Sequence, residues 1–239
     1  MNNKIRTRLQ KIKRHLARRL EGTRGDLGRP LFSAQPIRVE LADKVQAIGV
    51  GGIGLMHQLA HRVGLVEAID RRVHVLKDHR PYHESDHVLN LAYNALCDGV
   101  RLEDIELRRN DEVFLNALGA ERIPDPTTAG DFCRRFQKKD ISALMEAVDD
   151  ARLHVWARQP SAFLMRATID LDGTLVATTG ECKQGMDISY KGTWGYHPLV
   201  VSLAETGEVL RLVNRSGNRP SQEGAAAEAD AAITLCRRA

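Results

Sequence analysis

The spacing of apolar residues divides the chain into a part with helical periodicity and a part with strand-like character. Between residues 54 and 157, apolar side chains recur at steps of three and four, which is typical of amphipathic helices. Ser85 stands at a favourable N-cap position, and Gly99 follows the last periodic residue of that stretch. We therefore predict helices over residues 54–69, 85–97, 128–137 and 141–157.

The period changes near Phe163. Residues 163–176, 197–206 and 208–217 are rich in apolar and β-branched residues and predict three strands, the last two joined as an antiparallel hairpin by a turn at residues 205–208. Residues 221–239 are rich in alanine and predict a helix, whose C-terminal end suits Arg237 and Arg238. The expected fold class is α+β, with a mostly helical N-terminal half followed by three antiparallel strands and a helix.

The first 20 residues carry most of the positive charge. Their apolar residues recur at helical spacing, and they hold eight Lys or Arg and no acid, whereas the other 219 residues hold 27 basic and 31 acidic groups. Such a helix suits a polyanion, because Lys and Arg neutralise the phosphates of nucleic acid. A solvated helix docked on the protein fits the same pattern. The basic residues are Lys4, Arg6, Arg8, Lys11, Lys13, Arg14, Arg18 and Arg19.

The domain organisation follows from these shifts in composition. Residues 21–36 are rich in Gly and Pro and predict a linker, so the expected parts are a basic helical arm and linker (1–36), a helical domain (37–158) and a strand-containing domain (159–239). A hydrophobic content of 43% and a net charge of +4 are ordinary for a globular protein. No membrane span or secretory signal is evident, and the four cysteines form no Cys-x-x-Cys pair. We expect a cytosolic protein with reduced thiols.

Two aspartates stand out in the sequence "ATIDLDGTLV". Asp170 and Asp172 are one residue apart on a predicted strand, so both carboxylates point to the same face, where either can bind Mg²⁺. Asp-x-Asp-Gly-Thr is the usual signature of haloacid dehalogenase-type phosphatases, in which Asp170 would be the nucleophile and Asp172 the general acid/base. The residues after Asp172 predict an antiparallel hairpin and one helix, which is the wrong topology for that parallel core. A turn in which the acids cap backbone amides is a further alternative.

Two other patterns favour packing over ligand binding. Gly49, Gly51 and Gly54 match the dinucleotide-binding pattern Gly-x-Gly-x-x-Gly, but mostly helices follow, so we predict a helix start where backbones pack closely. The histidines are spaced like metal ligands, yet Pro81 interrupts the helical register between two of them. We predict capping, packing and solvent exposure for the histidines at positions 57, 61, 79, 83 and 87.

Several ordered motifs together resemble the transposases of bacterial insertion-sequence family 1380. They are "YHESDHVLNLAYNALCDGVRLEDIELRRND", "IPDPTTAGDFCRRF", "IDLDGTLV", "YKGTWGYHPLVVSLAETGEVL" and "RSGN". The resemblance implies a ribonuclease H-like catalytic domain with an Asp-Asp-Glu triad. Such a fold begins with three antiparallel strands followed by a helix, which agrees with the elements predicted above.

Carried over to this chain, the resemblance implies that Asp172 is the first acid of the triad and that Asp170 is its companion at the metal site. The chemistry uses two Mg²⁺ (or Mn²⁺) ions roughly 4 Å apart, which one strand cannot hold alone. In the family the second Asp and the Glu lie beyond the first helix, so we expect this chain to be truncated before them and the ribonuclease H-like domain to be incomplete. With two of the three acids missing, we expect the chain by itself to be inactive in cleavage and strand transfer. We assign none of Glu223, Glu228 and Asp230 to the triad.

The resemblance also implies the partner, which is DNA at transposon ends and at the target, bound by a homodimer in a synaptic complex. It implies that the helical domain (37–158) is the DNA-binding domain. The expected location is the bacterial cytoplasm, associated with the nucleoid. A non-catalytic DNA-binding relic or regulator shares most of the same residues and remains an alternative. Further candidate DNA contacts beside the first Asp are Lys183, Tyr190, Lys191, Trp194 and His197, for which turn and hairpin packing is the alternative role.

Overall fold

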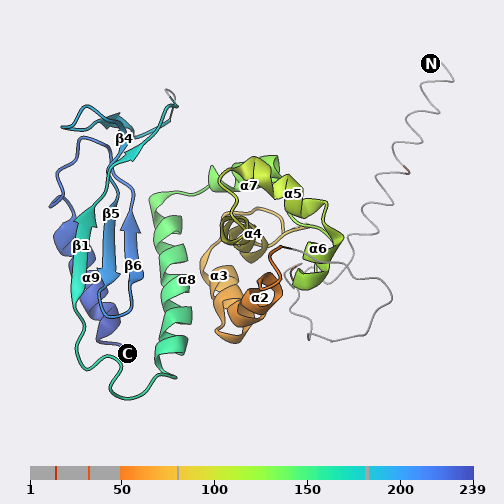
Figure 1. Cartoon of the computed structure of the whole chain (residues 1–239), viewed down its shortest axis with the longest axis horizontal. Helices are drawn as coiled ribbons and strands as arrows, with labels where there is room; N and C mark the ends of the chain where they lie inside the picture. The colour runs from red at the N-terminus through yellow and green to blue at the C-terminus, as the bar shows by residue number, and fades with distance from the viewer. Residues whose placement is uncertain (1–13, 15–31, 33–48, 80, 181–182) are drawn as a thin grey trace. The chain divides into compact units, whose positions relative to one another are not determined.

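The computed structural model describes residues 14, 32, 49–79, 81–180 and 183–239 (Figure 1), which fall into two compact units, residues 1–148 and 149–239. The predicted basic arm lies outside the described residues except for Arg14, which is helical and exposed. The described helices are α2 (Ile53–Arg62), α3 (Leu65–Arg72), α4 (Glu84–Leu96), η1 (Leu102–Asp104), α5 (Ile105–Arg109), α6 (Glu112–Leu118), α7 (Pro126–Cys133), α8 (Lys138–Trp156) and α9 (Ala225–Cys236). The strands are β1 (Ile169–Gly173), β2 (Val176–Ala177), β3 (Asp187–Ile188), β4 (Trp194–Tyr196), β5 (Leu199–Leu203) and β6 (Glu208–Val213).

The first unit is helical, as the periodicity predicts. Its main core gathers apolar side chains from α2 to α7 and includes Phe32, which lies in the stretch predicted as a linker. The single helix predicted over residues 54–69 is wrong, because Gly64 adopts a left-handed conformation with φ of 74° and separates α2 from α3. The glycine cluster is a turn at the start of α2, and close packing occurs at Gly54, where a Cβ would lie 3.0 Å from the Ala117 carbonyl oxygen.

The N-terminus of α4 is a buried polar hub that joins three segments. The Glu84 carboxylate accepts hydrogen bonds from the N–H groups of Val75 and Leu76, each at 3.1 Å. The Asp86 carboxylate accepts hydrogen bonds from the N–H groups of Phe32 and His83, each at 2.9 Å. Glu84 and Asp86 are 1% and 0% exposed, so these bonds satisfy groups that water does not reach. The acidic residues of "YHESDH" therefore hold the helical unit together.

Ser85 does not cap α4, which corrects the predicted boundary. His83 is the N-cap residue, and the Ser85 N–H and hydroxyl both donate to the Asp70 carboxylate on α3 at 2.9 Å. The Ser85 hydroxyl therefore bonds a residue of another helix, although the local sequence predicts that it caps α4. His87 stacks on Phe132 with ring centroids 4.3 Å apart, and His57 bonds the Tyr93 hydroxyl at 2.9 Å.

We expect the first unit to lose stability between pH 6.5 and 4. Burial lowers the pKa of His57 to about 4, with nearby His61 adding to the effect, and burial also lowers the pKa of His87 to about 4. The unfolded chain takes up protons near pH 6.5 and the folded chain only near pH 4, so the stability is complete above pH 6.5 and falls as the pH drops. The expected loss is about 1–2 kcal/mol per histidine.

Urea unfolding at pH 7 and at pH 4.5 measures this loss. Replacing both His57 and His87 with glutamine should flatten the pH dependence, whereas exposed His154→Gln should leave it as in the wild type. Equal pH dependence in all three proteins would contradict the assignment.

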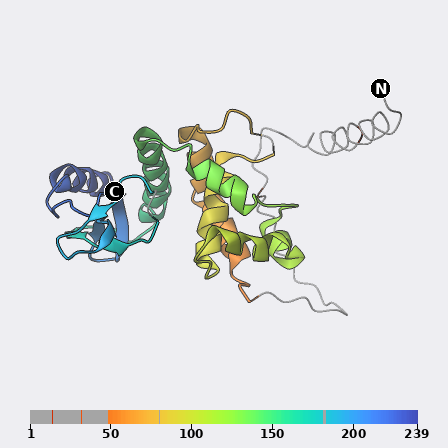
Figure 2. The ribbon, with the colours of Figure 1, turned by 90° about the horizontal axis from the view of Figure 1, so that it is seen from above.

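The second unit contains a three-stranded antiparallel sheet in the order β1-β5-β6, covered on one face by α9 (Figures 1 and 2). This confirms the predicted three antiparallel strands and the helix after them. The strand predicted over residues 163–176 is shorter, because Phe163 and Leu164 lie in turns and pack against the core of the unit. The core consists mainly of Trp156, Leu199, Val201, Leu203, Leu210, Ala232 and Leu235.

A half-buried ionic network joins the last part of α8 to β6 and α9. Arg152 pairs with Asp149 and, through Nε at 3.0 Å, with Glu208, and its Nη2 donates to the Val209 carbonyl at 2.7 Å. Arg211 on β6 pairs with Glu228 on α9 at 3.1 Å. The side chains of Arg152 and Asp149 are each only 10% exposed, so their charges depend on one another for compensation.

A second small sheet, in the order β2-β4-β3, extends from the connection between β1 and β5. The segment Arg215-Ser-Gly-Asn218 closes against it: Ser216 bridges Tyr196, and the Asn218 amide donates to Asp187 at 2.5 Å. A Cβ at Gly217 would lie 2.4 Å from the Asp187 carbonyl oxygen, so only glycine allows this approach. The motif "RSGN" therefore fastens one sheet of this unit to the other.

Candidate active site

Strand β1 presents Asp170 and Asp172 on the open face of the main sheet. Along β1 the burial alternates, with both aspartates exposed and Ile169 and Leu171 packed toward the core beneath α9. The register places Asp170 beside Ser202 and Asp172 beside Val200 on β5. The predicted pairing of the two carboxylates on one face is therefore present.

The two carboxylates are available to a ligand. Neither the Asp170 nor the Asp172 carboxylate has a hydrogen bond or an ion pair with another group in the described part of the chain. The alternative in which they cap backbone amides of a turn finds no such bond. Exposed carboxylate oxygens on one face are the donors that Mg²⁺ and Mn²⁺ prefer, so the pair fits a divalent ion.

Strand β1 is also an edge of the sheet, because β5 is its only partner among the described strands. The Ala204 N–H donates to the Thr168 carbonyl at 2.9 Å, and the Thr174 N–H donates to the Pro198 carbonyl at 3.0 Å. Hydrogen bonding alternates along an antiparallel pair, so the N–H and C=O groups of residues 169, 171 and 173 point away from β5. Backbone groups thus stand free beside the aspartates.

Gly173 has a steric reason to follow Asp172. A Cβ at Gly173 would lie 2.5 Å from His197 Nε2 and 3.1 Å from Arg215 Nη2, so the sequence Asp-Gly-Thr makes room for both side chains. His197 is 5% exposed and its Nδ1 bonds the Arg219 carbonyl at 2.7 Å, while Arg215 Nε donates to the His197 carbonyl at 3.0 Å. These residues support the end of β1 from the face opposite the aspartates.

A comparison with protein families supplies the decisive observation. The model of transposase DDE domain group 1 matches residues 35–239, which is most of the chain. The chain belongs to this DDE transposase family. Searches of curated proteins and of solved structures return no match. The family acts on DNA and generally uses divalent metal ions, and no helix in the described part of this DDE domain has the length and apolar character that a bilayer crossing requires.

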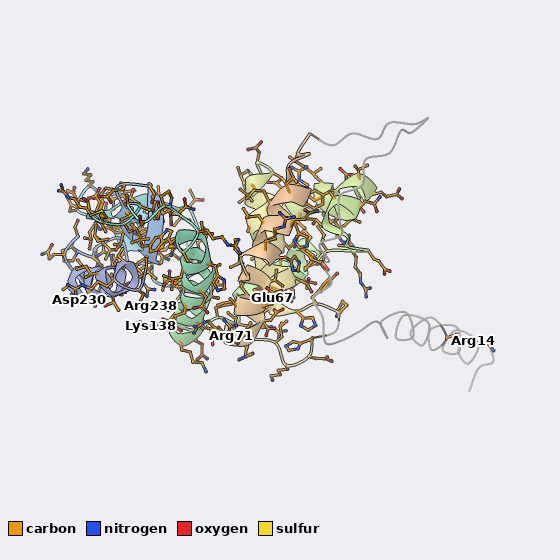
Figure 3. All side chains as sticks on the ribbon, turned by 90° about the horizontal axis from the view of Figure 1, so that it is seen from below. Arg14, Glu67, Arg71, Lys138, Asp230 and Arg238 are labelled. Atoms are coloured by element: carbon orange, nitrogen blue, oxygen red, sulfur yellow. The ribbon has the colours of Figure 1, made fainter. Side chains whose placement is uncertain are left out.

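Three acids late in the chain, Glu223 just before α9 and Glu228 and Asp230 on α9, lie away from the aspartate pair of the DDE domain. Glu223 pairs with Arg219 at 3.0 Å, Glu228 pairs with Arg211 at 3.1 Å, and Asp230 is exposed on α9 (Figure 3). α9 covers the face of the sheet opposite the aspartates, and the Glu223 carbonyl accepts from Arg215 on that same side, so none of the three joins Asp172. Among the described residues, no group of three or more His, Cys, Asp or Glu side chains is arranged to hold a metal ion.

The other predicted site residues of the DDE domain are divided by their exposure. Lys183, Tyr190, Lys191 and Trp194 are exposed in or beside the small sheet, whereas His197 is buried and packs against Gly173. The remaining candidates lie in the first 20 residues, of which the structure describes Arg14 alone. Sequence reasoning missed exposed Val176 and Ile188 of the same sheet, although the alternation in "DISYKGTWGY" was a signal for paired strands.

Proposed function

We propose that the chain is a transposase of the insertion-sequence family 1380 type, which binds transposon ends and takes part in metal-dependent DNA cleavage and strand transfer. The observation that carries the proposal is the exposed, unpartnered Asp170 and Asp172 on one face of β1, inside the region that matches the DDE family. An antiparallel β1-β5-β6 sheet followed by α9 is the arrangement expected at the start of a ribonuclease H-like domain.

Asp172 would hold a divalent ion, Mg²⁺ or Mn²⁺, with Asp170 as its companion. A bound ion supplies activation of water or of a 3′-hydroxyl and stabilisation of the leaving oxygen. The two aspartates bind and position that ion through their oxygens, and the open face of the sheet leaves space for DNA beside them. The other ligands come from water, DNA phosphate oxygens and further carboxylates of the complete triad.

DNA binding is assigned to basic residues and to the surface beside Asp172. Exposed Lys183 and Lys191 and the cationic first 20 residues would neutralise phosphates, which makes the affinity salt-dependent. We leave buried His197 out of this surface. Assembly as a homodimer on paired transposon ends, in a nucleoid-associated complex, is part of the same proposal.

A DNA-binding and cleavage assay with the full chain tests the proposal. We expect salt-sensitive binding to duplexes that carry the inverted repeats flanking the gene, and strand cleavage in Mg²⁺ or Mn²⁺ once a segment that carries the second Asp and the Glu of the triad is supplied. Asp172→Asn should reduce cleavage by about 100-fold or more, because one ligand of the catalytic ion loses its charge. Asp230→Asn, an exposed acid on the opposite side of the sheet, serves as the matched control and should leave binding and cleavage unchanged.

Two outcomes would replace the proposal with one of its alternatives. Hydrolysis of a small phosphomonoester in Mg²⁺ that is lost in Asp170→Asn would identify an aspartyl-phosphate phosphatase. Binding to the inverted repeats without cleavage in either metal ion would identify a non-catalytic relic or regulator.

A further inference from the structure

The small sheet β2-β4-β3 has one covered face and one open face. Asp187 and Gly195 meet the segment 215–218, which covers the first face. Cross-strand pairing places Val176 beside Tyr196 and Ile188 beside Trp194, so these four side chains share the other face. Val176, Ile188 and Trp194 are 46%, 55% and 40% exposed, which is unusual for large apolar groups gathered on so few strands.

The hairpin between β3 and β4 carries an aromatic side chain at its tip. The Ser189 N–H donates to the Thr193 carbonyl at 2.8 Å, the Thr193 N–H donates to the Ser189 hydroxyl at 3.0 Å, and Gly192 closes the turn with φ of 75°. These bonds hold Tyr190 outward at 84% exposure, with the Lys191 ammonium 5.5 Å from the centre of its ring. A rigid turn thus displays an aromatic ring together with a cation.

We propose that this open face and hairpin tip bind unpaired bases of DNA by stacking, with Tyr190 and Trp194 as the platforms. The inference rests on the proposed DNA-binding function and adds a specific class of ligand, single-stranded or frayed DNA next to the site of cleavage. Exposed aromatic side chains stack with bases of any sequence, and neighbouring cations follow the phosphate backbone. Lys191 at the tip and Lys183, which bonds Thr178 at 2.5 Å, supply those cations.

The charges around the platform favour nucleic acid over a protein partner. Asp187 is the only acid among the described residues of segment 174–197, and its carboxylate is engaged by Asn218 on the covered face. The open face and the hairpin tip therefore combine apolar area with the positive charge of Lys191, and no acid of the described part of segment 174–197 lies on them. A second copy of the chain would bring the same lysines against themselves, which like-charge repulsion opposes.

Tryptophan fluorescence of the full chain reads the stacking directly. The chain has two tryptophans, and Trp156 is 4% exposed with its indole N–H bonded to Glu208, so quenching by added DNA reports Trp194. The probes are a blunt duplex and the same duplex with a single-stranded tail of a few nucleotides. We expect quenching by the tailed duplex, and affinity for it about tenfold above that for the blunt duplex.

Variants test whether Tyr190 and Trp194 cause the higher affinity for the tailed duplex. Tyr190→Ala and Trp194→Ala should each reduce the advantage of the tailed duplex by several-fold while affinity for the blunt duplex stays unchanged. Ile233→Ala is the matched control, since it removes an apolar side chain of 37% exposure from α9, which covers the face of the main sheet opposite the aspartates. Circular dichroism of every variant verifies the fold.

The two proposals fail in different ways. Salt-sensitive binding of both duplexes with equal affinity and no quenching would overturn the stacking inference and leave the DNA-binding function standing. Absence of binding to either duplex would overturn the proposed function itself. Self-association of the wild type that disappears in Trp194→Ala would assign the face to a second copy of the chain.

Discussion

Asp86→Ala is expected to lower the free energy of unfolding of the helical unit by about 4 kcal/mol. The Asp86 carboxylate is fully buried and accepts the N–H groups of Phe32 and His83. Alanine leaves both donors without a partner in a place that water does not reach, and each unsatisfied buried group costs about 1–3 kcal/mol. The same substitution releases the segment around Phe32 from the N-terminus of α4.

Urea unfolding at neutral pH measures this loss, with Asp111→Ala as the matched control. Asp111 caps α6 and also accepts two backbone N–H groups, from Val113 and Phe114, but it is only half-buried. Water can solvate the donors that this variant frees, so the expected cost is about 1 kcal/mol. Equal losses in the two variants would show that burial of the Asp86 hub does not decide its contribution.

Arg152→Ala is expected to lower the free energy of unfolding of the second unit by about 3–5 kcal/mol, because it leaves a buried carboxylate without its main partner. Arg152 pairs with Asp149 and Glu208 and bonds the Val209 carbonyl. Burial raises the pKa of Asp149, and the guanidinium groups of Arg152 and Arg211 oppose that rise. Without Arg152 the Asp149 carboxylate keeps the ion pair with Arg211, at 3.6 Å, and the weaker influence of Arg238.

Amide hydrogen exchange of the full chain localises this effect, which should appear in β6 and α9. Arg219→Ala breaks the exposed pair with Glu223 and is the control, with an expected change of about 0–1 kcal/mol. In Arg152→Ala the folded pKa of Asp149 rises further, so the loss should shrink as the pH falls through that pKa, since protonation removes the stranded charge. A loss in Arg152→Ala as small as in the control would refute the network's role.

Much of the fold is encoded in local patterns, and the exceptions have tertiary causes. Periodicity located α4 and α8 and the region of α2, α3 and α7, but it did not predict the short η1, α5 and α6. The turn at residues 205–208 located the β5–β6 hairpin. Ser85 was misassigned as a cap because Asp70, fifteen residues earlier, takes its hydroxyl. Gly64 was read as part of a helix, since a glycine's left-handed conformation leaves no trace in apolar spacing.

The candidate site was predictable in its residues and less so in its surroundings. Alternation along a strand was enough to place Asp170 and Asp172 on one face. The roles of Gly173 and of the segment 215–218 depend on contacts between positions far apart in the chain, which one sequence does not reveal. For the same reason, the sequence leaves open whether His197 contacts DNA or packs within the hairpin, and in the structure it is buried beside β1.

The free edge of β1 gives the two aspartates a role in solubility that is separate from metal binding. An unpaired edge strand is a template on which another copy of the same strand can add. Antiparallel addition of a second β1 would bring carboxylates of the two copies to neighbouring positions on one face, where like charges destabilise the pair. The charges of Asp170 and Asp172 therefore oppose pairing between β1 strands of two chains, and neutralising them should favour aggregation.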